Sequence, residues 1–536
     1  MDTGTLNFAW SQALTAGLLA AGCRHAVLSP GSRSTPLALA LLRQTGLTTR
    51  VAVDERSAAF FALGIAKASQ RPVIVLATSG TAPANWLPAV IEASQGGHPL
   101  ILISADRPPE LYGVGANQTI DQIKLFGDHV RAAHALGAPS AGFETAYLHR
   151  LAARLVEQAC GPLPGPVHVN QPFHEPLIPT VDALPEAKMP EIRIARPLPP
   201  APEPTVIAQL ARQIAGRPGA IVVGELPPTP GLDAALGALA DTLACPLLIE
   251  PLSGLRFGPT LLPHACTRYA HWSGTLARRP EWVLRLGAWP VTRALQQWVA
   301  QVPEQILIEP QARWSDPAHR LNHLLRSDLV LTCRALAQAM LEQSLPPGPA
   351  DWLADVLAAE AEAPPLGAAW LIPVLLEALP ADCALFVGNS LAIRQLDLHG
   401  ARSAQPCRVY GNRGASGIDG NIATAAGLAA VHGQAVALLG DLTTQHDLGS
   451  LALAATQNLV ILTVNNGGGG IFDFLPQAAL PEFERGWRTP QTIDFAHAAA
   501  AFGLDYARAD TPDSLAAALQ NRTRAGGAHL VECRIG

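Results

Sequence analysis

The stretch that decides the fold is LLGDLTTQHDLGSLALAATQNLVILTVNNGG, residues 438–468. Its two apolar runs end in Gly440–Asp441 and in Asn465–Asn466, and a helix-length segment lies between them. A strand that ends in a polar loop, followed by a helix and a second such strand, is the pattern of a parallel α/β sheet. In these sheets ligands bind in the loops beyond the carboxyl ends of the strands.

The same strand-then-loop pattern recurs along the chain, in PVIVLATSG, PLILISADRP, GAIVVGEL and VLRLGAWP. We therefore predict an α/β protein whose parallel sheets are doubly wound. Residues 61–108 and 425–468 share one layout: a small-residue helix, a strand, a glycine-containing turn, a second helix and a second strand. The pattern alone favours the general likeness of α/β units, but two similar halves around a different middle segment would be a specific arrangement.

Two proline-rich zones punctuate the sequence. One runs from Pro172 to Pro204, and the other is LPPGPADW at 345–352, followed by AEAEAPPLG at 359–367. Such composition is typical of extended linkers. Because 536 residues are too many for one core, we expect three domains, at 1–180, 205–343 and 355–536.

Composition narrows the function classes. The net charge of -6 argues against a nucleic-acid binder, which would show a basic surface. The eight cysteines form no metal-binding pattern and indicate a reducing compartment. The N-terminus predicts a first helix rather than a signal peptide, and no apolar run approaches the length of a membrane span. We expect a soluble cytoplasmic protein.

Oxygen-bearing residues and glycines follow the two strands of the opening stretch. Asp441, the amide oxygens of Asn465 and Asn466, and the open backbone of the glycine run that follows them would form a hard-oxygen site of the kind that Mg²⁺ prefers. The alternative is ordinary turn chemistry, because Gly-Asp and Asn-Gly are common in turns. A second glycine-rich loop, VYGNRGASGIDG at 409–420, enters a helix and could bind phosphate, or could be only a tight connection.

Charged residues gather after other predicted strands. Arg33, Arg107, Arg394 and Arg413 each follow such a strand, and the arginine fork suits carboxylate recognition, so we predict an anionic substrate. In VAVDERSAAFFALG, residues 51–64, an acid pair stands where a strand gives way to a helix. Asp54 is a natural N-cap, whereas Glu55 has no evident structural task.

The Gly-Asp, helix, Asn-Asn pattern resembles the thiamine-diphosphate and Mg²⁺ motif of thiamine-diphosphate enzymes, with Leu442 in place of the commoner glycine. SPGSRSTPLALAL, DERSAAFFALGIAKAS, ATSGTAPANWLPAVIEAS, GANQTIDQ, FVGNSLAIRQLD and GNRGASGIDG are similar to the 2-succinyl-5-enolpyruvyl-6-hydroxy-3-cyclohexene-1-carboxylate synthases of menaquinone biosynthesis. The resemblance implies a pyrimidine-binding domain at 1–180, a central domain at 205–343 and a diphosphate- and metal-binding domain at 355–536.

The resemblance also implies a reaction. 2-Oxoglutarate would be decarboxylated with thiamine diphosphate and Mg²⁺ (or Mn²⁺), and the four-carbon carbanion would add to isochorismate in a 1,4 sense. The active sites would lie between chains of a homodimer or homotetramer. Two alternatives stay open: another thiamine-diphosphate enzyme, such as an acetohydroxyacid synthase or a 2-oxoacid decarboxylase, and a nucleotide-binding or regulatory protein without chemistry.

Site residues follow from the same resemblance, position by position. Glu55 corresponds to the catalytic glutamate that hydrogen-bonds N1′ of the aminopyrimidine, and Asp441, Asn466 and Gly468 correspond to the metal ligands. Further cofactor contacts are expected from Ser390, Gly417, Ile418, Gly440, Leu442, Ile471, Phe472 and Leu475. The substrate pocket is expected to contain Ser32, Arg33, Arg107, Asn117, Gln118, Arg293, Ser390, Arg394 and Arg413.

Overall fold

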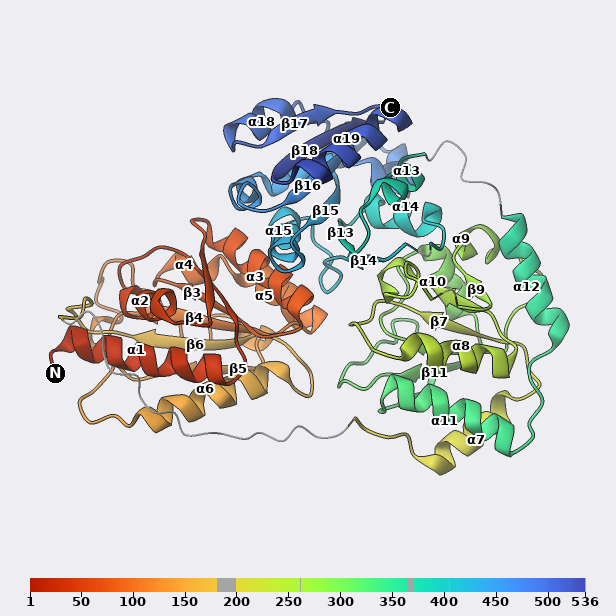
Figure 1. Cartoon of the computed structure of the whole chain (residues 1–536), viewed down its shortest axis with the longest axis horizontal. Helices are drawn as coiled ribbons and strands as arrows, with labels where there is room; N and C mark the ends of the chain where they lie inside the picture. The colour runs from red at the N-terminus through yellow and green to blue at the C-terminus, as the bar shows by residue number, and fades with distance from the viewer. Residues whose placement is uncertain (181–198, 261, 364–369, 404, 536) are drawn as a thin grey trace. The chain divides into compact units, whose positions relative to one another are not determined.

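The computed structural model contains three six-stranded parallel sheets with helices packed on them, which confirms the predicted fold class (Figure 1). The structure describes all residues except 181–198, 261, 364–369, 404 and 536. The first expected linker falls largely on 181–198, which lies outside the described residues.

The first sheet has the strand order β2-β1-β3-β4-β6-β5. Helices α1, α2 and α6 pack on one face, around Ile74 and Leu76, and α3 and α5 lie on the other (Figure 1). The strands are β1 (His25–Leu28), β2 (Thr48–Val51), β3 (Val73–Ala77), β4 (Leu100–Asp106), β5 (Ala132–Ala135) and β6 (Val167–Pro172). The helices are α1 (Thr3–Ala20), α2 (Thr35–Arg43), α3 (Glu55–Ser69), α4 (Thr81–Ala84), α5 (Leu87–Gly96) and α6 (Thr145–Cys160).

The central sheet has a different order, β12-β11-β10-β7-β8-β9, which is the order of dinucleotide-binding folds. Ile221 and Val223 face a core with α7, α8 and α11, whereas Ala220 and Val222 face the opposite core. The strands are β7 (Gly219–Val223), β8 (Leu247–Ile249), β9 (Ala265–Cys266), β10 (Trp282–Leu286), β11 (Glu304–Ile308) and β12 (Leu321–Leu325). The helices are α7 (Pro204–Ile214), α8 (Leu232–Leu243), α9 (Tyr269–Trp272), α10 (Arg293–Ala300), α11 (Leu329–Glu342) and α12 (Ala350–Glu362).

The third sheet has the order β14-β13-β15-β16-β18-β17. Its strands are β13 (Cys383–Val387), β14 (Cys407–Tyr410), β15 (Ala435–Gly440), β16 (Leu459–Asn465), β17 (Asp505–Arg508) and β18 (Ala528–Arg534). The helices are α13 (Leu371–Ala378), α14 (Leu391–His399), α15 (Asn421–His432), α16 (Asp441–His446), α17 (Leu451–Ala454), α18 (Phe495–Ala501) and α19 (Pro512–Ala525).

The predicted repeat is present in the first and third sheets. Counted from its first strand, each sheet has the order 2-1-3-4-6-5, so β3 and β4 correspond to β15 and β16. The matching helices α3 and α15 also contact each other through glycine. A Cβ built on Gly64 would lie 2.1 Å from the carbonyl oxygen of Thr424, and one built on Gly427 would lie 2.2 Å from that of Phe61. Only glycine permits this close crossing.

The second expected linker is partly wrong, because α12 forms a helix over Ala350–Glu362. Pro349 occupies its N-cap, where proline costs no hydrogen bond. Trp352 and Val356 are fully buried in the core of the central sheet, and the Trp352 indole donates to the carbonyl oxygen of Gly219 at 2.8 Å. The proline-rich composition predicted a linker, although the segment also contains an apolar helix face that packs against the central sheet.

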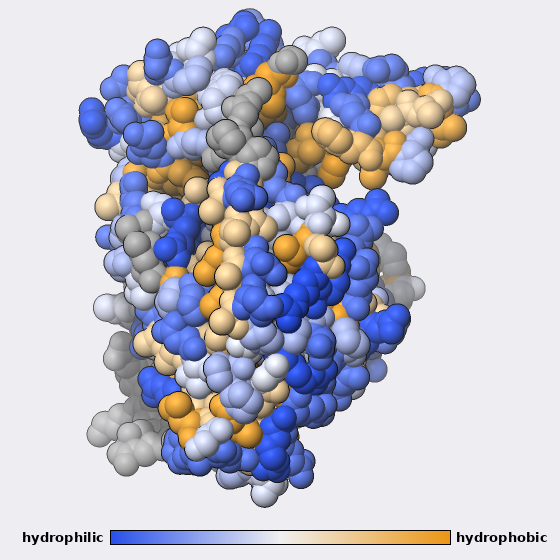
Figure 2. Space-filling view, turned by 90° about the vertical axis from the view of Figure 1, so that its right-hand side faces the viewer, coloured by the Kyte–Doolittle hydropathy of each residue, from blue (hydrophilic) through white to orange (hydrophobic). Residues whose placement is uncertain are grey.

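The chain divides into two compact units, one with residues 1–194, 412–508 and 522–536, the other with 195–411 and 509–521. The domain boundaries at 1–180, 205–343 and 355–536 stay a prediction. No helix in the described part is long and apolar enough to cross a bilayer. The face drawn in Figure 2 is mainly hydrophilic, with hydrophobic side chains in smaller groups.

Candidate active site

Glu55 is the first residue of α3, directly after the loop that follows β2. The Asp54 carboxylate caps this helix, accepting from the backbone N–H groups of Arg56 at 2.8 Å and Ser57 at 3.2 Å. The Glu55 side chain is half-buried and has no hydrogen-bond or ion-pair partner among the described residues. Capping is thus done by Asp54, and the Glu55 carboxylate stays available for a ligand.

Asp441 lies at the carboxyl end of β15 and begins α16. It is buried, and its carboxylate accepts from the N–H of Leu442 at 2.8 Å and of Gly468 at 2.7 Å. Burial raises the pKa of Asp441, and these two N–H groups oppose that shift. The second hydrogen bond brings the loop after β16 beside Asp441, as the positions of the two motifs predict.

The two asparagines after β16 have different surroundings. The Asn465 side chain donates to Glu532 at 2.7 Å and accepts from the N–H of Gly467. Its amide nitrogen and oxygen therefore both have partners within the chain. The side-chain oxygen of Asn466 is buried and lacks a partner in the described part of the chain. An uncharged oxygen of this kind, close in sequence to the Gly468 contact with Asp441, suits a hard cation.

The glycine run at 467–470 turns sharply. Gly467 and Gly468 have φ values of +75° and +127°, which side-chain-bearing residues rarely adopt. A Cβ on Gly468 would lie 2.2 Å from the carbonyl oxygen of Arg488. The run leads into the short helix η5 (Gly470–Phe474), which carries the predicted wall residues Ile471 and Phe472, with Leu475 as its C-cap.

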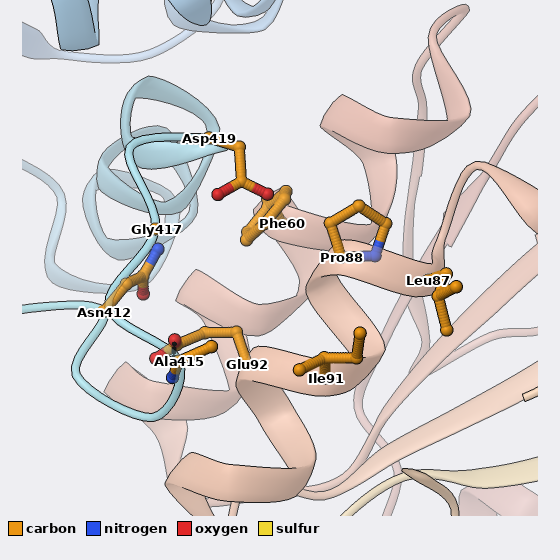
Figure 3. Close-up of a pocket in the computed structure, with 9 residues that line it drawn as sticks. All are labelled: Phe60, Leu87, Pro88, Ile91, Glu92, Asn412, Ala415, Gly417 and Asp419. Carbon is orange, nitrogen blue, oxygen red and sulfur yellow. Dashed lines mark hydrogen bonds between the residues drawn. The ribbon is translucent and has the colours of Figure 1, made fainter. Parts of the chain in front are cut away.

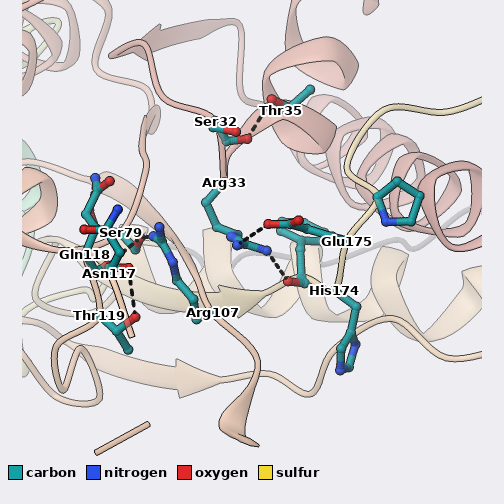
Figure 4. A network of polar contacts seen from close by, with 12 residues as sticks. Ser32, Arg33, Thr35, Ser79, Arg107, Asn117, Gln118, Thr119, His174 and Glu175 are labelled. Atoms are coloured by element: carbon teal, nitrogen blue, oxygen red, sulfur yellow. Dashed lines mark hydrogen bonds and ion pairs between the residues drawn. The ribbon is translucent and has the colours of Figure 1, made fainter. Parts of the chain in front are cut away.

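The first sheet brings several predicted substrate residues together (Figure 4). Arg33, after β1, is 8% exposed and pairs with Glu175 at 2.7 Å. Arg107, after β4, donates to the Ser79 hydroxyl, and the Gln118 amide donates to the Ser79 carbonyl oxygen at 2.9 Å. Burial lowers the pKa of Arg107, and the neighbouring charge of Arg33 lowers it further. Two arginines this close favour negative charge beside them, and Asp106 and Glu175 supply part of it.

Other predicted substrate residues lie near this pair or after it in sequence. Asn117 is adjacent to Gln118, and its carbonyl oxygen accepts from the Thr119 hydroxyl at 3.2 Å. Ser32 precedes Arg33, and its carbonyl oxygen accepts from the Thr35 hydroxyl at 2.7 Å. Figure 4 shows these residues around Arg33 and Arg107, so the loops at the carboxyl end of the first sheet hold five of the nine predicted positions.

Ser390, Arg394 and Arg293 belong to the second unit. Ser390 has a φ of +66° at the N-cap of α14, and the Arg394 guanidinium donates to its carbonyl oxygen at 2.7 Å. Arg293 is an exposed residue at the start of α10. One turn after Arg394, the fully buried Asp397 accepts from Arg256 at 3.0 Å and from the Tyr269 hydroxyl, which fixes α14 in this unit.

The loop after β14 carries Arg413, Gly417 and Ile418, and it lies against α5 of the first sheet (Figure 3). The Glu92 carboxylate of α5 accepts from three backbone N–H groups of this loop. A cavity of about 270 Å³ lies here. It is lined by Phe60, Leu87, Pro88, Ile91, Glu92, Asn412, Ala415, Gly417 and Asp419.

Sequence reasoning missed three acidic residues around these loops. Glu175 pairs with Arg33, Glu92 holds the Arg413 loop, and Asp447 accepts from Ile422 N–H at 2.8 Å while it faces Arg56 at 3.6 Å. Burial raises the pKa of Asp447 to about 6. Glu92 stands in the mainly apolar stretch LPAVIEAS, which was a usable signal, whereas nothing around Asp447 or Glu175 marked them.

Comparisons with known proteins agree with this geometry. Residues 9–125 match the thiamine pyrophosphate enzyme N-terminal TPP binding domain, and residues 392–533 match the corresponding C-terminal TPP binding domain. A 2-succinyl-5-enolpyruvyl-6-hydroxy-3-cyclohexene-1-carboxylate synthase from Dechloromonas aromatica (strain RCB) is 58% identical over 99% of both chains. The chain belongs to this synthase family.

More distant members of the synthase family cover the chain as fully. The synthase from Myxococcus xanthus (strain DK1622) is 40% identical over 99% of this chain and 95% of its own. The crystal structure of benzoylformate decarboxylase from Polynucleobacter necessarius has a TM-score of 0.73, with 17% identity and 98% coverage of both chains. At that identity the likeness supports the fold alone.

The residues present fit the cofactor that the two TPP binding domains imply. Among the described residues no three His, Cys, Asp or Glu side chains are grouped to hold a metal. A cation beside the diphosphate would therefore combine Asp441 with neutral oxygens, and the unpartnered Asn466 oxygen supplies one. Arg33 follows β1 and Arg107 follows β4, so both lie at the sheet end where ligands of α/β proteins bind.

Proposed function

We propose that this chain decarboxylates 2-oxoglutarate and adds the resulting succinyl carbanion to isochorismate, giving 2-succinyl-5-enolpyruvyl-6-hydroxy-3-cyclohexene-1-carboxylate. The proposal extends to this chain the activity for which its relatives are named. Residues 1–180 would bind the aminopyrimidine of thiamine diphosphate, and 355–536 its diphosphate and Mg²⁺. The central domain at 205–343 would contribute Arg293.

The Arg33–Arg107 pair is the observation that carries the choice of substrate. Both proposed substrates bear carboxylates, and a buried or half-buried arginine fork binds a carboxylate with two parallel hydrogen bonds. Asn117, Gln118 and Ser32 add neutral donors and acceptors beside the pair. The uncharged aldehyde that a 2-oxoacid decarboxylase releases would not need two adjacent cations.

Glu55 is proposed to hold a proton at N1′ of the aminopyrimidine, because its carboxylate has no other partner in the described residues. Asp441, Asn466 and Gly468 would hold Mg²⁺, and Gly440, Leu442 and Ser390 would line the cofactor site. Ile418, Ile471, Phe472 and Leu475 would exclude water from it. When bound, thiamine diphosphate supplies the carbon nucleophile and the electron sink for decarboxylation.

We also propose a homodimer or homotetramer in the cytoplasm. Large hydrophobic side chains beside the candidate site are exposed in the single chain: Val53 is 84% exposed, two residues before Glu55, and Phe474 is 78% exposed, two residues after Phe472. Exposed apolar groups of this size next to a site favour a covering chain. None of the eight cysteines, all of which lie in the described part of the chain, forms a disulfide, as expected in a reducing compartment.

The test is incubation of the purified protein with thiamine diphosphate, Mg²⁺, 2-oxoglutarate and isochorismate, with the product mass measured. The expected product has the combined mass of both substrates less one CO₂. Pyruvate replaces 2-oxoglutarate in a second reaction. Turnover of pyruvate but not of 2-oxoglutarate would favour an acetohydroxyacid synthase or a pyruvate decarboxylase and would overturn the proposal.

A further inference from the structure

Glu92 lies in the middle of α5, in the first sheet's half of the molecule, and is 3% exposed. A buried carboxylate is costly unless it is paired or hydrogen-bonded. Here the partners are backbone N–H groups more than 300 residues away in sequence: Gly414 at 2.8 Å on one carboxylate oxygen, and Ala415 at 2.7 Å and Ser416 at 3.3 Å on the other.

The loop that Glu92 holds lies tightly against α5. Gly414 is pressed against α5, since a Cβ on it would lie 2.5 Å from the Glu92 carbonyl oxygen and 2.6 Å from the Gly96 nitrogen. Ser416 has a φ of +64°, a conformation that costs free energy without glycine. Three hydrogen bonds to one charged acceptor offset that cost and fix the loop in a single geometry.

We propose that Glu92 is a positioning residue, which sets the place of Arg413 and Ile418 by clamping the intervening backbone onto α5. This inference rests on the proposed function, in which Arg413 binds substrate and Ile418 contacts the cofactor. Figure 3 shows Glu92 pointing from α5 to the loop at Ala415, on the rim of the cavity that Gly417 also lines. Glu92 itself need touch neither substrate nor cofactor.

Glu92→Gln tests the clamp. Glutamine keeps one acceptor oxygen and turns an NH₂ group toward the remaining backbone N–H groups. We expect amide hydrogen exchange at residues 414–416 to accelerate about tenfold or more, because local opening tracks the free energy of these bonds. The KM for an anionic substrate should rise at least about fivefold, since a loosened Arg413 weakens ground-state binding.

Glu360→Gln is the matched control. Glu360 of α12 also accepts from consecutive backbone N–H groups, those of Thr267 at 2.7 Å and Arg268 at 2.9 Å, and from the Trp272 indole at 2.8 Å. It has no part in the candidate site. The control should lower the melting temperature by a similar amount but leave exchange at 414–416 and both KM values unchanged.

Gly414→Ala gives a second route if Glu92→Gln does not fold, because its methyl group pushes the same loop from α5 while Glu92 remains. It should reproduce the rise in KM. Unchanged exchange and unchanged KM in Glu92→Gln would overturn the inference, and so would equal losses of activity in Glu92→Gln and Glu360→Gln. If the wild-type protein makes no synthase product, the proposed function fails, and the exchange rates alone decide whether Glu92 clamps the loop.

Discussion

The first and third sheets share one strand order, whereas the central sheet has another, and the two kinds differ at their carboxyl ends. After strands of the outer sheets, the Glu55 carboxylate and the Asn466 amide oxygen have no partner among the described residues. After strands of the central sheet, Glu250 accepts from Val291 N–H at 2.6 Å, and Glu309 accepts from Gln311 N–H at 2.9 Å. Glu250 thus ties the loop after β8 to the loop after β10, and Glu309 holds its own loop.

The strand order of the central sheet reverses between β7 and β10, and backbone hydrogen bonds join the chain segments that follow these two strands. Gly224 N–H donates to Leu286, and Ala288 N–H donates to Glu225, so hydrogen bonding continues past the ends of β7 and β10. A Cβ on Gly224 would lie 2.1 Å from the Ala288 carbonyl oxygen. A strand order shared with dinucleotide-binding folds therefore does not make a site here. Function depends on which polar groups of the loops have no hydrogen-bond partner within the protein and can therefore bind a ligand.

Of the changes to the first and third sheets, Glu55→Gln should have the largest effect, which is a loss of activity. The amide cannot hold a proton as the acid does, and losing an acid–base group costs about 10²–10⁴ in rate. We expect kcat for product formation to fall by that range, while thiamine diphosphate, followed by tryptophan quenching, still binds. Asp54→Asn is the control, because asparagine caps a helix as well as aspartate does. Full activity of Glu55→Gln would refute the assigned role.

Asp447 makes the contact between α3 of the first sheet and α15 of the third sheet sensitive to pH. Its folded pKa of about 6 lies above the ordinary value of 3.8, so the unfolded chain releases this proton first and stability falls as pH rises between the two values. Relative to Asp447→Asn, the wild-type protein should lose about 2 kcal/mol of unfolding free energy from pH 4 to pH 7. Urea unfolding of both proteins across that range measures it, and a constant difference would contradict the prediction.

The glycine crossing of α3 and α15 gives the next prediction. Gly64→Ala should destabilise the protein by about 1–3 kcal/mol, because the methyl group would overlap the Thr424 carbonyl and overpacking costs this much. Gly237→Ala in α8 is the matched control: its nearest neighbour would lie at 3.5 Å, so it should stabilise by about 0.5–1 kcal/mol. Calorimetric melting distinguishes the two. A similar shift in both variants would show that the crossing tolerates a side chain.

Local patterns predicted the features that depend on short stretches. Strand-ending polar residues predicted the three α/β sheets, and the rule that parallel strands end at one edge predicted that Asp441 would meet the loop after Asn466. Glu92 could not be predicted in its role, since its partners are far away in sequence and contribute only backbone. The central strand order and the burial of Trp352 likewise depend on tertiary packing that composition does not encode.

The smallest expected effect is the change in melting temperature when a dinucleotide, which would bind at the central sheet, is added. A ligand present at a hundred times its Kd adds about 2.7 kcal/mol to the free energy of unfolding. Thiamine diphosphate with Mg²⁺ should raise the melting temperature in this way, whereas NAD⁺ or FAD at the same concentration should leave it unchanged, because the Gly224 and Ala288 hydrogen bonds fill the crevice. A dinucleotide shift as large as that of thiamine diphosphate would mean that the β7–β10 loops open, and it would revive the nucleotide-binding alternative.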